Sequence, residues 1–355
     1  MKKEIITATI GLAAVLLNQS AFSKSTIGGI VFTNFYTQDI EETDNTNTKT
    51  DTKTTKLEVP GNSRLRVRWD NEDNVGMYVE MGLGSDVRLR HAYGKWDISE
   101  TSQILAGQTS TPFAPLNPSV AMVNNSGDGY GNVSPGRRSQ IRYTYKFLNR
   151  QGAFAVALVD PKVKNEPATS ETTLPRIDMG LAYRTFDWQI FPSLFFTKQS
   201  FDGTGDITAS GVSIGAKTAF GPVTFSTEVG AGKNWGNTQM TLGSSFIGQN
   251  NGVDSAGTPT EDNDNLSYWV DVGYRFTGDE TKGTVHFIYG FSSSELGNTR
   301  DLESTMIGIS APIDFPYIAR GFRIRPEIFV FDDEDNIGTA EKTDTIAGIQ
   351  LQYTF

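Results

Sequence analysis

Three arginines, Arg64, Arg66 and Arg68, stand two residues apart in one short segment. In an extended strand such residues project to the same side, about 6.6 to 6.8 Å from one another. A guanidinium group stays charged and offers a planar fork that matches a carboxylate or a phosphate. Stacked like charges repel, so water, carboxylates or a passing anion must relieve them. The spacing therefore predicts anion recognition along a wetted surface.

Further bases repeat this even spacing. Arg88 and Arg90 form one pair, and Arg138, Arg142 and Lys146 form a second set. Rings or ladders of arginine and lysine are one way to build an anion-selective pore. The alternative is that these bases only pair with Glu80, Asp178 and Glu228 and so stiffen a wall. We favour conduction, because the bases of this parity outnumber the acids and crowd on neighbouring segments.

Alternating segments of roughly ten residues recur from Thr26 onward and are typical of the strands of a bacterial transmembrane barrel. We place sixteen of them at 26–38, 57–69, 75–84, 86–98, 102–112, 138–147, 153–160, 175–185, 188–198, 208–220, 223–231, 266–276, 283–292, 301–312, 321–331 and 345–355. An even number puts both ends of the chain on the periplasmic side, where the short connections must lie. The longer polar connections, such as 39–56, 232–265 and 332–344, would face outward.

The opposite parity of these segments is apolar. Uninterrupted runs include those from Leu65 to Trp69, Val75 to Met81, Ile141 to Phe147 and Tyr268 to Phe276. A lysine or arginine on a lipid-facing surface costs about 2 to 4 kcal/mol at the bilayer midplane, so such runs indicate a lipid face. His91 falls on this parity, which suggests that it is buried at a subunit contact.

The connection 113–137 differs from the other long ones. It is rich in apolar residues, contains the glycine-rich run Gly127-Asp128-Gly129-Tyr130-Gly131 and ends at Arg137-Arg138. A segment folded into the barrel could bury these apolar residues and narrow the channel; an external lid or a subunit contact is the alternative. The predicted pore-lining and constriction residues are Arg64, Arg66, Arg68, Glu80, Arg88, Arg90, Asp128, Arg138, Arg142 and Lys146.

The two ends of the chain agree with an exported barrel. Lys2 and Lys3 precede an apolar run and a small-residue stretch ending at Ser23, so residues 1–23 read as a signal peptide and 24–355 as the barrel domain. The last ten residues, I-A-G-I-Q-L-Q-Y-T-F, place apolar residues on one face and end on Phe355. The sequence thus predicts an all-β protein, a 16-stranded antiparallel transmembrane β-barrel with an inward-folded third loop.

Composition limits the possible partners and chemistry. The formal net charge of -10 argues against nucleic acid, and the absence of cysteine excludes disulfides and thiolate metal sites. Acidic residues gather at Asp332 to Asp335, where they could bridge divalent cations to lipopolysaccharide or form a solvated loop tip; we assign no metal there. With two histidines and no nucleophile motif, we expect neither an enzyme nor a cofactor.

Two short motifs carry a resemblance. Val87 to Gly94 reads V-R-L-R-H-A-Y-G and Ala106 to Thr109 reads A-G-Q-T, followed by a third long connection with proline and phenylalanine. This pattern resembles the trimeric outer-membrane porins of Gram-negative bacteria, in particular the DcaP-like group. The resemblance implies a homotrimer, arginines near the constriction and a preference for small anions such as dicarboxylates, and it supports Arg88 and Arg90 as pore liners.

These observations predict an outer-membrane porin, a passive diffusion channel for small hydrophilic solutes that prefers anions. Its expected partners are outer-membrane lipid and lipopolysaccharide, small anionic solutes and further copies of the chain. A non-conducting adhesin or structural barrel, in which the acidic loops do the work, is the alternative function. A soluble β-sandwich is the alternative fold, and the signal-like start, the terminal aromatic and the rhythm of the connections argue against it.

Overall fold

A computed structural model describes the chain except for residues 1–23, 85–86, 119–121, 134, 162–169, 172–173, 202–204, 241–261, 298–299 and 337–339. The predicted signal peptide lies outside these described residues. The described part forms one antiparallel sheet of 19 strands and a short 3-10 helix. Within it, no helix combines the length and apolar character needed to span a membrane.

The strands follow the order β1 (Lys24–Thr43), β2 (Lys49–Glu58), β3 (Arg64–Asp70), β4 (Val75–Leu83), β5 (Val87–Asp97), β6 (Ser102–Ser110), β7 (Arg137–Phe147), β8 (Gly152–Val159), β9 (Ser170–Glu171), β10 (Arg176–Arg184), β11 (Trp188–Phe201), β12 (Gly205–Phe220), β13 (Val223–Lys233), β14 (Asp264–Thr277), β15 (Lys282–Leu296), β16 (Arg300–Ser310), β17 (Ile313–Asp314), β18 (Phe322–Asp335) and β19 (Glu341–Thr354). The 3-10 helix η1 (Trp235–Thr238) lies between β13 and β14.

Three positions in the sheet are each filled by two consecutive strands. β1 pairs with both β2 and β3, β15 pairs with both β16 and β17, and β9 and β10 both pair with β11. Each interruption contains a proline, namely Pro60, Pro175 and Pro312. Proline has no N–H to donate to the ladder, so the pairing breaks there and resumes beyond it. Counted by position, the sheet therefore has the predicted sixteen strands.

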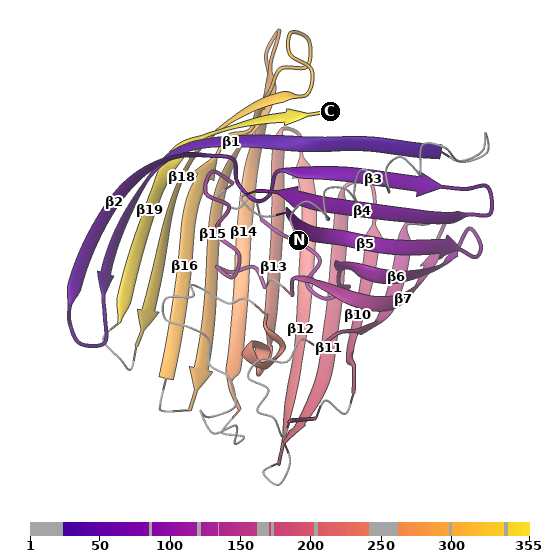
Figure 1. The fold of residues 1–355 in the computed structure, drawn as a ribbon, viewed down its shortest axis with the longest axis horizontal. Helices are drawn as coiled ribbons and strands as arrows, with labels where there is room; N and C mark the ends of the chain where they lie inside the picture. Colours follow the sequence, from indigo (N-terminus) through magenta and orange to yellow (C-terminus); the bar gives the residue numbers. More distant parts are fainter. Residues whose placement is uncertain are drawn as a thin grey trace.

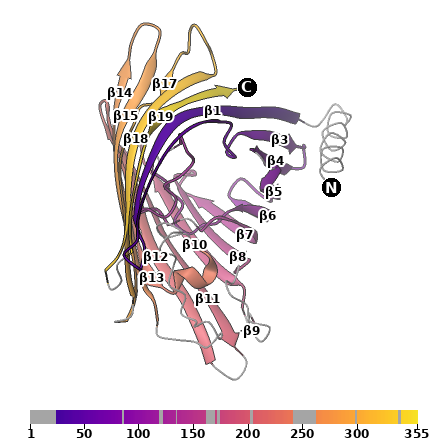
Figure 2. The ribbon, with the colours of Figure 1, turned by 60° about the vertical axis from the view of Figure 1, so that its left-hand side comes forward.

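The sheet closes on itself through its first and last strands. β1 pairs with β19 from Ile30 opposite Thr354 to Thr43 opposite Glu341. Gly29 and Phe355 extend the pairing through reciprocal backbone hydrogen bonds of 3.0 and 3.2 Å. Figure 1 shows the C-terminus beside β1, and Figure 2 shows the tilted strands curving round the interior. The predicted closed antiparallel barrel, with the C-terminal segment as its closing strand, is confirmed.

Several strands run further than predicted. The connection 39–56 is largely strand, since β1 and β2 pair out to a tight turn after Thr43. In that turn, the side chain of Thr46 and the backbone N–H groups of Thr48 and Thr46 donate to Asp44 and lower the pKa of its carboxyl group. β18 and β19 likewise pair from Glu334 opposite Glu341. The predicted connection 332–344 is therefore shorter than expected at both ends, because residues 332–335 belong to β18 and residues 341–344 belong to β19.

The exterior is apolar around the described wall. Its exposed large side chains include Ile141, which is 62% exposed, together with Val75, Val272 and Tyr274, so three of the four predicted outward runs have exposed members. In the run from Leu65 to Trp69, Val67 is buried and the other two are partly exposed. Aromatic residues gather near the short turns, among them Phe186, Phe220, Tyr353 and Phe355. Apolar flanks with aromatic ends match the lipid-facing band and interfacial girdle of a transmembrane barrel.

Candidate functional site

The connection between β6 and β7 is here called the third loop (residues 111–136), and its described residues lie against the inner wall opposite β3–β5. Three carboxylates of that wall bind it. Glu228 on β13 accepts from the backbone N of Leu116 at 3.3 Å, and Glu327 on β18 accepts from the backbone N of Val123 at 2.7 Å. Asp333 accepts from the Tyr130 hydroxyl at 2.8 Å. The predicted inward-folded third loop is confirmed, and these acids serve to hold it.

Glycine lets the loop backbone reach the wall at Gly131. Its N–H donates to Ser292 Oγ at 2.8 Å, and its carbonyl accepts from Ser267 Oγ at 2.6 Å. Its φ is +84°, and an added Cβ would lie 2.3 Å from the carbonyl oxygen of Tyr268. A side chain at this position would therefore push the loop off β14 and β15. The glycine-rich run is a docking element, and loop flexibility does not account for it.

An apolar cluster holds the start of the loop. The Phe113 ring packs edge-on against Phe195 of β11 and Trp235 of η1, with centroid distances of 4.7 and 6.2 Å. The guanidinium of Arg176 lies 4.2 Å from the Phe195 ring centroid and binds both oxygens of Asp178. Arg176 and Asp178 are thus fully buried beneath the loop, so Asp178 pairs with a buried arginine and not with a base of the bore.

The first residues of the connection between β13 and β14 also enter the barrel, while residues 241–261 lie outside the described part of the chain. Trp235 is 0% exposed, and its indole N–H donates to the carbonyl oxygen of Ser210 at 2.9 Å. The hydrogen bond from Asn234, followed by that from Lys233, lowers the pKa of Asp262 at the other end of this connection. The prediction that 232–265 is an outward polar loop was wrong for its first residues, because Trp235 and Met240 are apolar and bury themselves against Phe113.

On the facing wall, one carboxylate gathers three guanidinium groups. Glu80 on β4 is 3% exposed and binds Arg66 Nε at 2.8 Å and Arg90 Nε at 2.7 Å. Arg64 Nη1 lies 3.6 Å from the same carboxylate, and the Tyr78 hydroxyl donates to it at 2.9 Å. One negative charge therefore faces three positive ones, which leaves this wall electropositive. We call Arg64, Arg66, Arg90 and Glu80 the arginine wall.

A cavity of about 400 Å³ lies beside the arginine wall at the end of the barrel that carries the long loops. It is lined by Arg88, Arg90 and Arg137, and by Asn125 from the third loop. Arg88 is exposed, and no ion pair of its side chain is found among the described residues. Asp128, predicted as a constriction residue, is exposed on the loop within electrostatic reach of Arg137. The loop and the arginine wall thus face each other across water-accessible space.

A β-bulge explains why alternation fails on β5. Glu80 pairs with His91 and Met81 pairs with Leu89, so Arg90 is the extra residue. Beyond the bulge the parity is reversed, and Trp96 is exposed on the outside at 50%. His91 consequently faces inward, where its Nδ1 lies 2.9 Å from Thr109 Oγ1. The prediction of a lipid-side His91 at a subunit contact was wrong, because a bulge shifts every following side chain to the other face.

Arg138 does not face the bore as predicted. Its side chain is 0% exposed and donates to the carbonyl oxygens of Pro135, Asp160, Pro161 and Thr238. The Arg138 side chain does point inward, but the third loop and η1 occupy the space between it and the bore. Its neighbour Arg137, absent from the predicted set, reaches the cavity instead. Arg137 is the first residue of β7 and follows Gly136, whose φ of +69° is not that of a strand. The direction of the Arg137 side chain therefore does not follow the alternation of the strand.

Of the remaining predicted bases, Arg68 and Lys146 lie lower in the barrel, toward the short turns, whereas Arg142 reaches the long-loop end of β6. Arg68 Nε binds Asp70 at 2.6 Å, and Lys146 Nζ lies 3.7 Å from Asp97. Lys95 bridges the same two carboxylates at 3.3 and 3.2 Å. Arg142 Nη1 donates to the carbonyl of Ser110 at 3.4 Å. The predicted ladder is therefore divided into the arginine wall above and a charge-paired cluster below.

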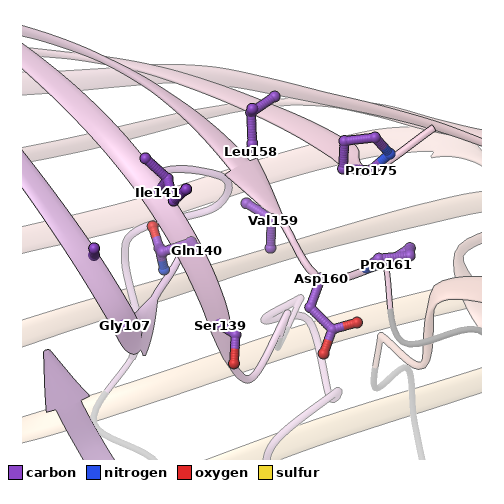
Figure 3. Close-up of a pocket in the computed structure, with 10 residues that line it drawn as sticks. Gly107, Ser139, Gln140, Ile141, Leu158, Val159, Asp160, Pro161 and Pro175 are labelled. Atoms are coloured by element: carbon purple, nitrogen blue, oxygen red, sulfur yellow. The ribbon is translucent and has the colours of Figure 1, made fainter.

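Two other features lie apart from this bore. A hollow on the outer surface is lined by Ala106, Gly107, Ile141 and Leu158, and Figure 3 shows the last two on adjacent strands. Because Ile141 and Leu158 are exposed members of the lipid-facing parity, this hollow is outside the barrel. Inside, His286 Nδ1 lies 2.8 Å from Asp271. Among the described residues, no group of three or more potential metal ligands converges.

No protein-family model and no curated protein matches this sequence. Solved structures do match. The outer membrane channel DcaP of Acinetobacter baumannii has a TM-score of 0.71 at 17% identity, with 95% of this chain and 99% of that chain covered. An anion-selective porin from Comamonas acidovorans gives 0.65 at 14%, with 94% and 100% covered. The trimer form of Vibrio cholerae OmpT gives 0.60 at 15%, with 94% and 100% covered. These likenesses establish that the chain has the sixteen-stranded barrel fold of the porins.

Proposed function

We propose that this chain is an outer-membrane porin through which small hydrophilic solutes diffuse passively, with a preference for anions such as dicarboxylates. The observation that carries the proposal is the arginine wall, where Arg64, Arg66 and Arg90 share the single carboxylate of Glu80. With the exposed Arg88 beside it, this wall presents excess positive charge to the space below the third loop. Anions are attracted there and cations are repelled.

The presence of three arginines around one cavity supports a dicarboxylate as one solute class. Arg88 and Arg90 line one cavity of about 400 Å³ together with Arg137. Each guanidinium can bind a carboxylate through two parallel N–H groups. A short solute with two carboxylates can therefore bind one arginine while its other carboxylate leaves the previous one. Binding at each arginine must be weak, because a tightly bound solute would not pass through rapidly.

The fold supports the location. A closed barrel leaves no unpaired strand edge, its exterior is apolar, and its aromatic residues cluster near the short turns. We infer that it sits in the bacterial outer membrane with the short turns in the periplasm, in contact with lipid and lipopolysaccharide, after removal of residues 1–23. One matching structure is described as a trimer, and we propose a homotrimer here as well.

The alternative of a non-conducting adhesin rests on the acidic extracellular segments. In the structure, Asp333 is used to hold the third loop through Tyr130, and Asp332 accepts from Thr343 at 2.8 Å. These carboxylates therefore have structural partners within the barrel. A loop held by carboxylates so as to face an arginine wall is expected of a channel and serves no purpose in an adhesin.

Planar-bilayer recording tests the proposal. In a potassium chloride gradient the purified protein should conduct, with a reversal potential displaced toward that of chloride. The triple variant R66Q/R88Q/R90Q should lose most of this displacement, whereas K198Q, which removes an exposed base paired with Asp206, should retain it. A protein that never conducts would favour the adhesin, and unchanged selectivity in the triple variant would show that the arginines only support the wall.

A further inference from the structure

The contact between His91 and Arg137 defines the protonation state of the histidine. Arg137 Nε lies 3.0 Å from His91 Nε2. A guanidinium N–H can only donate, so Nε2 must be the unprotonated acceptor. The ring proton then belongs on Nδ1, which lies 2.9 Å from Thr109 Oγ1 and donates to it. His91 is therefore neutral, as the Nδ1–H tautomer, while this arrangement persists.

The surroundings of His91 are charged on several sides. Tyr78 and Glu80 face it from β4, Arg90 lies next to it on β5, and Arg64 approaches from β3. Arg137 at the start of β7 completes the set, and the third loop brings Asp128 within electrostatic reach of Arg137. A proton on Nε2 would remove the acceptor for Arg137 and place two like charges side by side.

We propose that His91 is a positioning residue for Arg137, and that protonation of His91 releases this arginine toward the bore and raises the preference for anions. The inference rests on the proposed function, because it concerns the same anion path. Its physical basis is that a neutral imidazole can accept from a guanidinium while an imidazolium cannot. Protonation adds the positive charge of the His91 imidazolium to the cavity wall. It also allows the Arg137 guanidinium to turn toward Asp128.

Reversal potentials measured in a potassium chloride gradient from about pH 8 to about pH 3.5 test this, and the range extends below ordinary histidine titration because the adjacent Arg137 charge opposes protonation of His91. The chloride-to-potassium permeability ratio of the wild type should rise as the pH falls. It should rise about twofold more than in H91Q, as expected for one added charge about 8 Å from the path in roughly 0.1 M salt. The glutamine keeps an oxygen acceptor for Arg137 but cannot be protonated, so it isolates the histidine from the titration of Glu80 and Asp128.

The histidine can also be observed directly. The chain has two histidines, so H286Q assigns the imidazole signals of His91 in a nitrogen-15 spectrum of the whole protein in detergent. At about pH 8 the expected signal is that of the Nδ1–H tautomer, and R137Q should abolish this preference. H286Q should leave the pH profile of selectivity unchanged, because His286 lies on β15 beside Asp271.

The outcomes separate the two proposals. If wild type and H91Q are both anion-selective with superimposable pH profiles, the role of His91 is refuted and the channel function stands. If the wild type conducts without anion preference at about pH 8, the proposed function fails. An Nε2–H tautomer of His91 in the wild type would overturn the inference whether or not any variant folds.

Discussion

Glu80 offers the sharpest test of the electrostatics, because three arginines share its single negative charge. The variant E80Q keeps the shape of the side chain and one oxygen acceptor but removes the charge. Arg66 and Arg90, at 2.8 and 2.7 Å, would compete for that oxygen, and Arg64 at 3.6 Å would lose its counter-charge. The net charge of the arginine wall rises by one, so anion preference should increase.

The size of the increase follows from Coulomb's law. A unit charge about 5 Å from a solute in water is worth about 0.8 kcal/mol, and screening in roughly 0.1 M salt leaves about 0.5 kcal/mol. Anion occupancy then rises about twofold and cation occupancy falls about twofold, so the permeability ratio should increase roughly fivefold. Removal of one partner from a buried charge cluster should also lower the free energy of unfolding, by up to about 3 kcal/mol.

Reversal potentials in a potassium chloride gradient measure the ratio, and urea denaturation followed by gel mobility measures the stability. The matched control is D70N, which removes a carboxylate paired with Arg68 and Lys95 at the short-turn end, away from the third loop. It makes the same charge change but should alter the ratio less than E80Q does. If E80Q leaves selectivity unchanged, or shifts it toward cations, the arginine wall does not line the solute path.

Two further changes test how the third loop is held. The double variant E228A/E327A removes the acceptors of two hydrogen bonds from the loop backbone and leaves buried N–H groups without those partners, at about 1 to 3 kcal/mol each, so it should give larger and noisier single-channel conductance. The control D314N, which disrupts the Arg323 pair near a short turn, should not. W235A removes a fully buried ring that packs on Phe113 and should cost about 3 to 5 kcal/mol in unfolding free energy, with a wider channel. If both variants conduct like the wild type, the loop does not set the size of the constriction.

Much of the wall follows from local pattern. A strand exposes alternate side chains to opposite environments, so apolar and polar parity can be read directly from the sequence. That reasoning located all sixteen strand positions and placed Arg66, Glu80 and Arg90 on one inner surface. It did not foresee the breaks at Pro60, Pro175 and Pro312, although proline was the available signal.

The charge balance of the bore could not be read in the same way. A count of inward-facing residues assumes that every acidic side chain contributes its charge to the water-filled bore. Glu228 and Glu327, however, are buried beneath the third loop. Arg138 was counted as a pore base for the same reason, although four carbonyl groups enclose it. Which inward residues meet water depends on where the loop lies, and that depends on contacts with residues 79 to 228 positions away.

By itself, the sequence determined the fold class, the two faces of the wall and the excess of arginine on the inner face, because side-chain parity is a local property of an extended chain. The tertiary structure decided the rest. The extra residue Arg90 becomes a bulge only when β4 pairs with β5, and that register turned His91 inward to meet Arg137. Pairing register and loop docking are set by distant residues, so no local pattern encodes them.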